Sequence, residues 1–176
     1  LSDTPPVSVV KSMTQAWFNT QGNIPSVMAA LINHDDSWQL TAENNSTHKT
    51  DAHLKFKTPR EFVISSCRAC GQNKPKPSLY KTLEVLGHGL FNAGSPAGYP
   101  DLQSAWLGTS ALNSRIEWAS HFAANLVKQN NIDPITIARN ALGPLLSPTS
   151  ANAIARAESK HQALTLFLMS PEFQRR

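Results

Sequence analysis

Charged residues are scarce in this chain. Asp, Glu, Lys and Arg make up 16% of its 176 residues, against about 25% in an average globular protein. This composition excludes a disordered tail and a coiled coil, which both depend on a higher density of charge. No apolar run approaches the roughly 18 residues that a membrane span needs. Because 40% of the residues are hydrophobic, we expect a globular chain with a core of its own and no membrane span.

The charged residues that are present give no sign of a nucleic-acid partner. Sixteen basic residues against twelve acidic ones leave a net charge of +4 and a pI near 9.3. A nucleic-acid surface needs clustered Lys and Arg, commonly with aromatic residues between them. Here the basic residues are scattered along the chain. We therefore expect the excess charge to serve solubility.

Stretches that alternate apolar and polar residues are also missing, so strands are not expected. Helix starts are instead marked by a capping residue followed directly by proline, whose missing N–H costs nothing at the first helical position. This pair occurs five times, at Thr4-Pro5, Thr58-Pro59, Asp133-Pro134, Ser147-Pro148 and Ser170-Pro171. Apolar residues at helical spacing then predict seven helices, at residues 5–20, 24–34, 59–70, 78–88, 109–129, 134–142 and 148–169.

The sequence therefore predicts an all-α fold, an irregular helical bundle of about seven helices in a single domain, 1–176. A Gly/Pro-rich loop at 94–100 interrupts the helices, and the polar stretch 41–55 is expected to be an exposed loop. The chain begins at Leu1 and shows neither the charged nor the apolar part of a signal peptide. We expect it to be a fragment of a longer protein.

One arginine falls on the apolar side of the helix predicted at 109–129. The apolar face of that helix is formed by Leu112, Ile116, Ala119, Ala123 and Leu126, with Trp118 and Phe122 beside them. Arg115 lies within this sector, and a buried guanidinium needs a carboxylate or carbonyl groups around it. Asp101 is its predicted partner. Together with His88, these two residues form a candidate polar site, although a structural ion pair between loop and helix is the simpler interpretation.

Cysteine is scarce too, since the chain has only Cys67 and Cys70, spaced as Cys-x-x-Cys. A redox pair of this kind usually begins a helix, where the dipole lowers the pKa of the first thiol. Here the pair falls in the last turns of the helix predicted at 59–70, and no second pair completes a four-thiolate zinc site. Buried structural thiols are the favoured interpretation, and a disulfide or a metal or redox site are the alternatives.

Other motifs of known chemistry are absent from the sequence. It has no nucleophile elbow, no P-loop and no dinucleotide fingerprint, and its six histidines form no metal-binding pair. It therefore implies no metal and no cofactor. Tyr99, Trp106 and Trp118 are a candidate aromatic groove beside the Gly/Pro-rich loop, although aromatic residues at such a loop more often pack onto the core.

Several stretches, in order and spacing, resemble the C-terminal portion of the bacterial domain-of-unknown-function 1800 family. They are 34–38 (HDDSW), 56–66 (FKTPREFVISS), 86–88 (LGH), 95–101 (SPAGYPD), 106–108 (WLG), 115–119 (RIEWA) and 170–175 (SPEFQR). The resemblance implies a longer, mostly helical protein that is often exported, and hence a periplasmic or extracellular location. It implies no established activity and no catalytic residues. His88, Tyr99, Cys67 and Cys70 stand where other residues are common in the family, which argues against a shared metal or thiol chemistry there.

Three functional hypotheses follow. The first is a non-catalytic helical interaction or structural module of an exported bacterial protein, whose partner is another protein. The second is a cell-envelope hydrolase or ligand-binding domain with a site near the 94–101 loop. The third is a thiol or metal protein that works through Cys67 and Cys70. Whether the chain is an enzyme stays open at this point.

Overall fold

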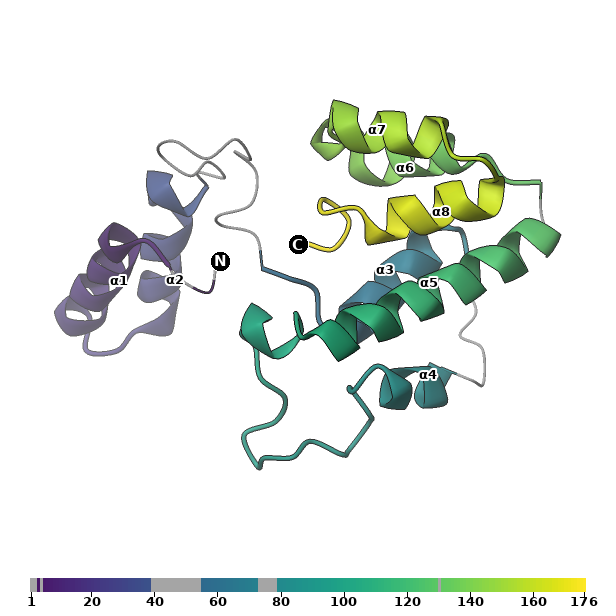
Figure 1. Ribbon diagram of the computed structural model, residues 1–176. Coiled ribbons are helices and arrows are strands. Elements are labelled where there is room, and N and C mark those ends of the chain that lie inside the picture. The colour runs from purple at the N-terminus through teal and green to yellow at the C-terminus, as the bar shows by residue number, and fades with distance from the viewer. Residues whose placement is uncertain (1–2, 4, 39–54, 73–78, 130) are drawn as a thin grey trace. The chain divides into compact units, whose positions relative to one another are not determined.

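The computed structural model describes residues 3, 5–38, 55–72, 79–129 and 131–176 (Figure 1). Thr4 and residues 41–54 of the predicted exposed loop lie outside them. The described residues form eight α-helices and no strand longer than an isolated bridge, which confirms the all-α fold. None of these helices is both long enough and apolar enough to cross a membrane. The chain divides into two compact units, Leu1–Lys55 and Phe56–Arg176. The single domain that the sequence predicts stays a prediction.

The first unit is a pair of helices, α1 (Val7–Asn19) and α2 (Ile24–Ile32), followed by a short 3-10 helix, Asp35–Ser37. The turn between α1 and α2 contains Gly22 at φ +83°, a backbone conformation that residues other than glycine rarely adopt. Asn23 caps α2, because its Oδ1 accepts a hydrogen bond from the backbone N–H of Ser26 at 3.0 Å. The predicted start of α1 at residue 5 is two residues early.

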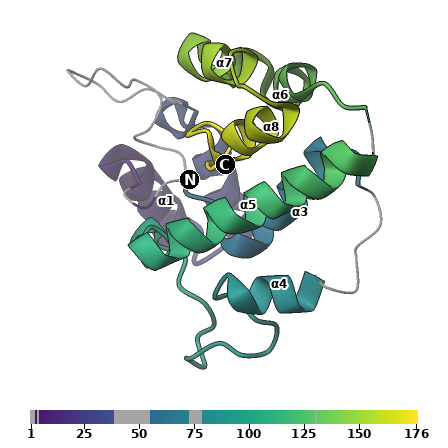
Figure 2. The same ribbon diagram turned by 45° about the vertical axis from the view of Figure 1, so that its right-hand side comes forward.

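The second unit contains six helices: α3 (Pro59–Ala69), α4 (Leu79–Val85), α5 (Thr109–Gln129), α6 (Pro134–Leu142), α7 (Pro148–Ala155) and α8 (Lys160–Met169). In Figures 1 and 2, α8 lies between the long α5 and the α6–α7 pair, and it packs on all three. Ala163, Leu164, Phe167 and Leu168 are all buried. This helix is central because its apolar residues cover more of its circumference than a surface helix would allow.

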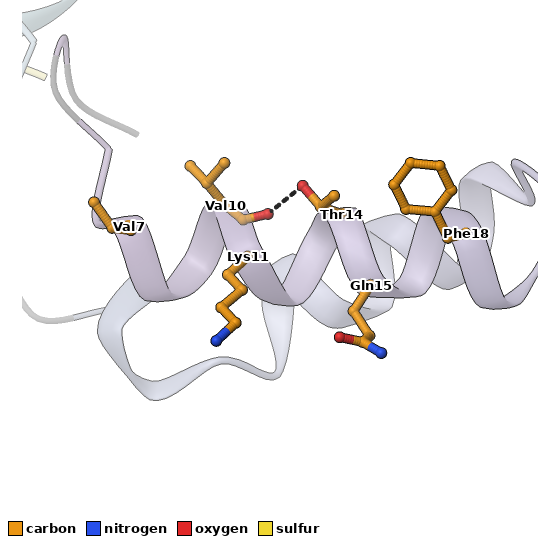
Figure 3. Close-up of a pocket in the computed structure, with 6 residues that line it drawn as sticks. All are labelled: Val7, Val10, Lys11, Thr14, Gln15 and Phe18. Carbon is orange, nitrogen blue, oxygen red and sulfur yellow. Dashed lines mark hydrogen bonds between the residues drawn. The ribbon is translucent and has the colours of Figure 1, made fainter.

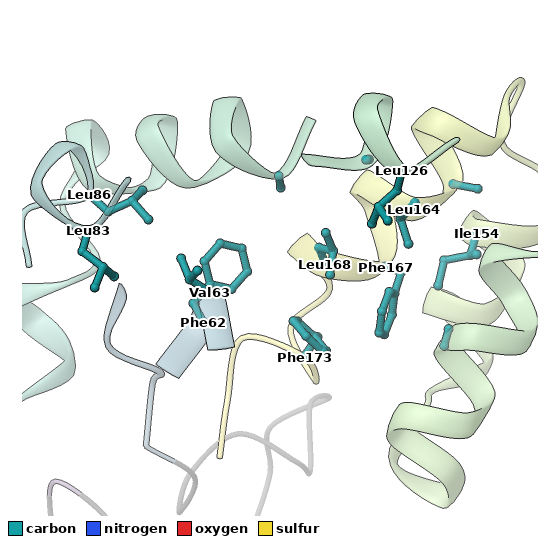
Figure 4. Close-up of a cluster of buried hydrophobic side chains, with 14 residues drawn as sticks. Phe62, Val63, Leu83, Leu86, Leu126, Ile154, Leu164, Phe167, Leu168 and Phe173 are labelled. Atoms are coloured by element: carbon teal, nitrogen blue, oxygen red, sulfur yellow. The ribbon is translucent and has the colours of Figure 1, made fainter. Parts of the chain in front are cut away.

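The hydrophobic core of this unit gathers side chains from all six of its described helices and from the segment after α8 (Figure 4). Phe62 of α3 contacts Trp118 of α5 edge to face, with ring centroids 5.2 Å apart. The ring centroid of Phe173, which follows α8, lies 4.7 Å from that of Phe167 and 6.4 Å from that of Phe62. A residue that follows the last helix is therefore part of the core.

Several helix starts are capped as the sequence predicts. The most complete case is Thr58, whose Oγ1 accepts the N–H of Glu61 while the carboxylate of Glu61 accepts the N–H of Thr58 at 2.9 Å. Ser147 caps α7 with its side chain alone, because its Oγ accepts the N–H of Ser150 at 3.1 Å. Asp133 precedes α6 but accepts instead from the hydroxyl of Thr136, at 2.6 Å. Ser170-Pro171 begins only a turn.

The prediction of one helix over 148–169 is wrong, because α7 ends at Ala155 and α8 begins at Lys160. Ser159 caps α8, and its Oγ accepts the N–H of Gln162 at 3.1 Å. In return, the side chain of Gln162 accepts the N–H of Glu158 at 2.9 Å. These two bonds satisfy donors that a continuous helix would use internally, so they stabilise a break that apolar spacing alone does not reveal.

We expect Thr58→Ala to lower the free energy of unfolding by about 1 kcal/mol, because the backbone N–H of Glu61 in the first turn of α3 loses the Thr58 Oγ1 that accepts it. Urea denaturation followed by circular dichroism measures this loss. Thr149→Ala is the matched control, because Thr149 is exposed within the first turn of α7 and caps no helix. Equal losses in the two variants would show that the capping box contributes nothing.

Candidate functional site

The segment after α8, Ser170–Arg176, returns to the residues that precede α3. Phe56 and Arg175 form an antiparallel bridge, and the N–H of Lys57 donates to the carbonyl of Gln174 at 2.8 Å. The Lys57 ammonium donates to the Phe173 carbonyl at 2.5 Å and lies 4.0 Å from the centre of that ring. Burial lowers the pKa of Lys57 to about 8, which the nearby Glu61 opposes. We call this arrangement the C-terminal clasp, formed by Phe56–Lys57 and Phe173–Arg175.

Arg115 of α5 lies at the centre of the C-terminal clasp and is only 1% exposed. Its guanidinium donates to the side-chain oxygen of Gln174 at 2.9 Å and to the carbonyl of Lys57 at 2.7 Å. It also lies 4.5 Å from the ring centre of Phe56 and 5.3 Å from that of Phe62. Burial lowers the pKa of Arg115 to about 10, which still leaves it charged at neutral pH, and Glu61 opposes the shift.

The predicted pair of Arg115 with Asp101 does not form. Both ends of the guanidinium are used by Gln174 and the backbone of Lys57, since these neutral oxygens lie within the core that Arg115 enters. Asp101 is exposed and lies 3.4 Å from the guanidinium of Arg176, which also pairs with Glu61 at 2.9 Å. The buried face of α5 contains Arg115, Ala119, Ala123 and Leu126 as predicted, whereas Ile116, also predicted on it, is 46% exposed.

His88 belongs to a cluster of aromatic rings and contacts neither Asp101 nor Arg115. Its ring centroid lies 4.3 Å from that of Tyr99 and 5.3 Å from that of Trp106, on which it stacks. Burial lowers the pKa of His88, Arg60 adds to this shift, and its Nδ1 is buried without a hydrogen-bond partner. The predicted polar site of His88, Asp101 and Arg115 is therefore not assembled by direct contacts.

The same cluster fixes the Gly/Pro-rich loop. The Tyr99 hydroxyl lies 2.8 Å from the carbonyl oxygens of Gly89 and Asn92, and Trp106 donates to the carbonyl of Pro100 at 3.0 Å. Trp118, the third residue of the predicted aromatic groove, lies elsewhere. It stacks on Phe122 at 4.9 Å and meets Phe62 in the core. The three predicted aromatic residues thus serve two different clusters and do not line one groove.

Cys67 and Cys70 lie in and just after the last turn of α3 as half-buried side chains that pack against the core. Burial raises the pKa of Cys70 to about 12, and the neighbouring Cys67 adds to the shift. A thiol with so little thiolate at neutral pH is a poor nucleophile and a poor metal ligand. Within the described residues, no three His, Cys, Asp or Glu side chains are grouped so that they could hold a metal ion.

A groove of about 790 Å³ runs between the outer face of α3, the end of α6 and the C-terminal clasp. Its walls include Ile64, Arg68, Leu145 and Phe173. Sequence analysis does not find this groove, because its walls come from segments that lie far apart in the chain. It misses Lys57 and Gln174 as partners of Arg115 for the same reason. The only signal for the groove is that Ile64 falls on the otherwise polar side of α3.

Comparison with models of protein families gives one match. The family model for the protein of unknown function DUF1800 matches residues 1–175. The chain belongs to the DUF1800 family. None of the curated proteins and none of the solved structures compared with it shows a match. Three stretches that carry the DUF1800 resemblance, 56–66, 115–119 and 170–175, meet at the Arg115 guanidinium. These three stretches of the DUF1800 chain therefore form the C-terminal clasp and the helix turn that carries Arg115.

We expect Arg115→Met to lower the free energy of unfolding by about 2–4 kcal/mol. The change leaves two buried acceptors, on Gln174 and Lys57, without their donor. Chemical denaturation measures the loss. Arg139→Met is the control, because Arg139 is exposed on α6 and methionine has nearly the helix propensity of arginine. A loss no larger than that of the control would contradict the structural role of Arg115.

We also expect the Cys70 thiol to be unreactive in the folded protein. In a Cys67→Ser variant at pH 8, iodoacetamide should alkylate Cys70 at least roughly a hundredfold more slowly than in the same variant unfolded in urea, because burial removes the thiolate. Mass spectrometry of timed samples gives both rates. Similar rates in the two states would restore the hypothesis of a reactive thiol.

Proposed function

We propose that this chain is a non-catalytic helical interaction module of an exported bacterial protein, and that it acts through contacts with another protein. The observation that carries the proposal is a row of large apolar side chains on the surface of α1. The exposed fractions are 83% for Val7, 46% for Val10 and 74% for Phe18. These residues border a groove of about 440 Å³ together with Thr14 and Gln15 (Figure 3).

The row is regular enough to receive a helix. Val7, Val10, Thr14 and Phe18 follow the three- and four-residue steps of one helix face, and Figure 3 shows them along the same side of α1. The second helix adds Ile24, Met28 and Ile32, exposed by 57%, 45% and 53%. Each of the two helices thus carries several large exposed apolar side chains, and exposed apolar surface of this kind is typical of proteins that bind partners.

The chemistry of α1 defines the kind of partner. Lys11 is the only charged residue in this helix, so its surface offers apolar contact rather than a charge pattern. An amphipathic helix that lays its apolar face along this row would bury the exposed side chains of both. The family resemblance supports export, because related chains often carry export signals, and we therefore place the module in the periplasm or outside the cell.

The experiment is site-specific crosslinking in the cells that produce the protein. A photoreactive amino acid at the position of Thr14, inside the row, is compared with one at Asn152, which is exposed on α7. The partner captured only from the first position is identified by mass spectrometry and purified. Its affinity is then measured for the unchanged chain, for Phe18→Ser and for Phe91→Ser.

Phe18→Ser should weaken binding roughly tenfold or more, because a buried phenylalanine contributes about 1.5–3 kcal/mol. Phe91→Ser is the matched control, since Phe91 is a phenylalanine of the second unit that is even more exposed than Phe18, 106% against 74%. Equal effects of the two changes, or no partner specific to the first position, would contradict the proposal. Turnover of a substrate by the purified chain, abolished by a single substitution, would overturn its non-catalytic part.

The alternative of a hydrolase or ligand-binding site near the 94–101 loop depends on Asp101 and Arg115 acting together. In the structure their partners are different, since Arg115 binds Gln174 and Lys57 while Asp101 pairs with Arg176. The thiol alternative requires a reactive pair, and the raised pKa of Cys70 opposes it. No observation favours either alternative over the interaction module.

A further inference from the structure

The groove between α3, the end of α6 and the C-terminal clasp is a second surface with a ligand chemistry of its own. It belongs entirely to the second unit, Phe56–Arg176, and so does not depend on the apolar row of α1. Its volume of about 790 Å³ lies within the range of about 300–1,000 Å³ that is usual for ligand pockets.

The charges that line the groove are mostly positive. Four of its residues are basic, namely Lys57, Arg68, Arg175 and Arg176, and two are acidic, namely Glu61 and Glu172. Both acidic side chains are already used inside the protein. Glu61 accepts from the N–H of Thr58 and pairs with Arg176, and Glu172 accepts from the backbone of Ser147 and the hydroxyl of Ser150. The groove therefore presents net positive charge to a ligand.

Arg68 is the basic residue of the groove that is available to a ligand. Lys57 is held by the Phe173 carbonyl and ring, Arg176 by Glu61 and Asp101, and the Arg175 guanidinium lies 3.4 Å from the side-chain oxygen of Gln103. Arg68 is exposed in the last turn of α3, and its guanidinium makes no hydrogen bond or ion pair with the described residues. Its guanidinium can thus form a two-point contact with a carboxylate.

The groove also offers apolar surface next to this charge. Ile64 precedes Arg68 by one helical turn on the same face of α3, and Leu145 lines the groove after α6. These two side chains are 43% and 52% exposed. The one aromatic ring among the lining residues, Phe173, is 3% exposed, so it cannot stack on a nucleic-acid base.

We propose that this groove binds an acidic and partly apolar peptide segment of another protein, with a carboxylate on Arg68 and an apolar side chain between Ile64 and Leu145. The charge of the groove selects an acidic ligand, and its exposed aliphatic floor selects a peptide rather than a nucleic acid. Because both features lie on rigid helices and their connection, the site is formed before the ligand arrives.

Fluorescence anisotropy with the purified full chain tests this proposal. The probe is a short labelled peptide that alternates leucine with glutamate, and its counterpart carries glutamine in place of glutamate. A labelled single-stranded oligonucleotide is the third probe. The variants are Arg68→Gln, Leu145→Ser and, as the matched control, Arg156→Gln, which removes the same charge from an exposed position at the end of α7.

The acidic peptide should bind, and the glutamine peptide should bind at least about tenfold more weakly. Arg68→Gln should weaken the acidic peptide about fivefold to tenfold and Leu145→Ser by a similar factor, because each removes one of the two proposed contacts. Arg156→Gln should leave its affinity unchanged. Loss of binding with Leu145→Ser while the circular dichroism spectrum stays unchanged separates a lost contact from misfolding.

Three results would overturn the proposal. One is no binding of the acidic peptide. Another is equal weakening by Arg68→Gln and Arg156→Gln, which would indicate attraction to the net charge of the protein alone. The third is tighter binding of the oligonucleotide than of the peptide with the same dependence on Arg68, which would make the groove a nucleic-acid site.

Discussion

The second unit depends on one buried charge. Arg115 reaches from α5 into the core, where oxygens of Gln174 and Lys57 accept from its two terminal nitrogens and two phenylalanine rings lie beside it, while its Nε has no hydrogen-bond partner. A guanidinium in this position is expensive to bury unless its donors are satisfied. It therefore couples three segments that no helix connects directly: the entry to α3, the face of α5 and the residues after α8. These three segments must meet for the charge to be accommodated.

The residues that stabilise the fold are different from those that are exposed to a partner. Residues of both candidate sites hold the protein together: Arg115 of the candidate polar site lies in the C-terminal clasp, and Tyr99 and Trp106 of the candidate aromatic groove fix the Gly/Pro-rich loop. The groups left available lie on the outer faces of helices. They are the apolar row of α1 and Arg68 with its aliphatic neighbours. Surfaces of this kind recognise other chains, which is why we propose an interaction module.

Much of the helical architecture can be predicted from the sequence, because caps and apolar spacing are local signals. Thr58 with Glu61 marks the start of α3 to the residue, and α5 and α6 have their predicted bounds. The break before α8 is not predicted, because the apolar spacing continues across the stretch in which Ser159 and Gln162 form their two hydrogen bonds. The partners of Arg115 are not predicted either, for a different reason. Gln174 and Lys57 lie 59 and 58 residues away in the chain, and nothing in local spacing distinguishes their oxygens from the carboxylate of Asp101.

The place of Phe173 and Gln174 in the chain bears on how the protein is made. Both follow α8, yet Phe173 is part of the core and Gln174 satisfies the buried guanidinium. During synthesis the described helices leave the ribosome before these two residues do, so until then Arg115 lacks the Gln174 oxygen and Phe62 lacks the ring of Phe173. Until then the nascent chain exposes apolar surface that chaperones bind and that promotes aggregation. The second unit is thus committed to folding after translation of this stretch, rather than helix by helix as the chain emerges.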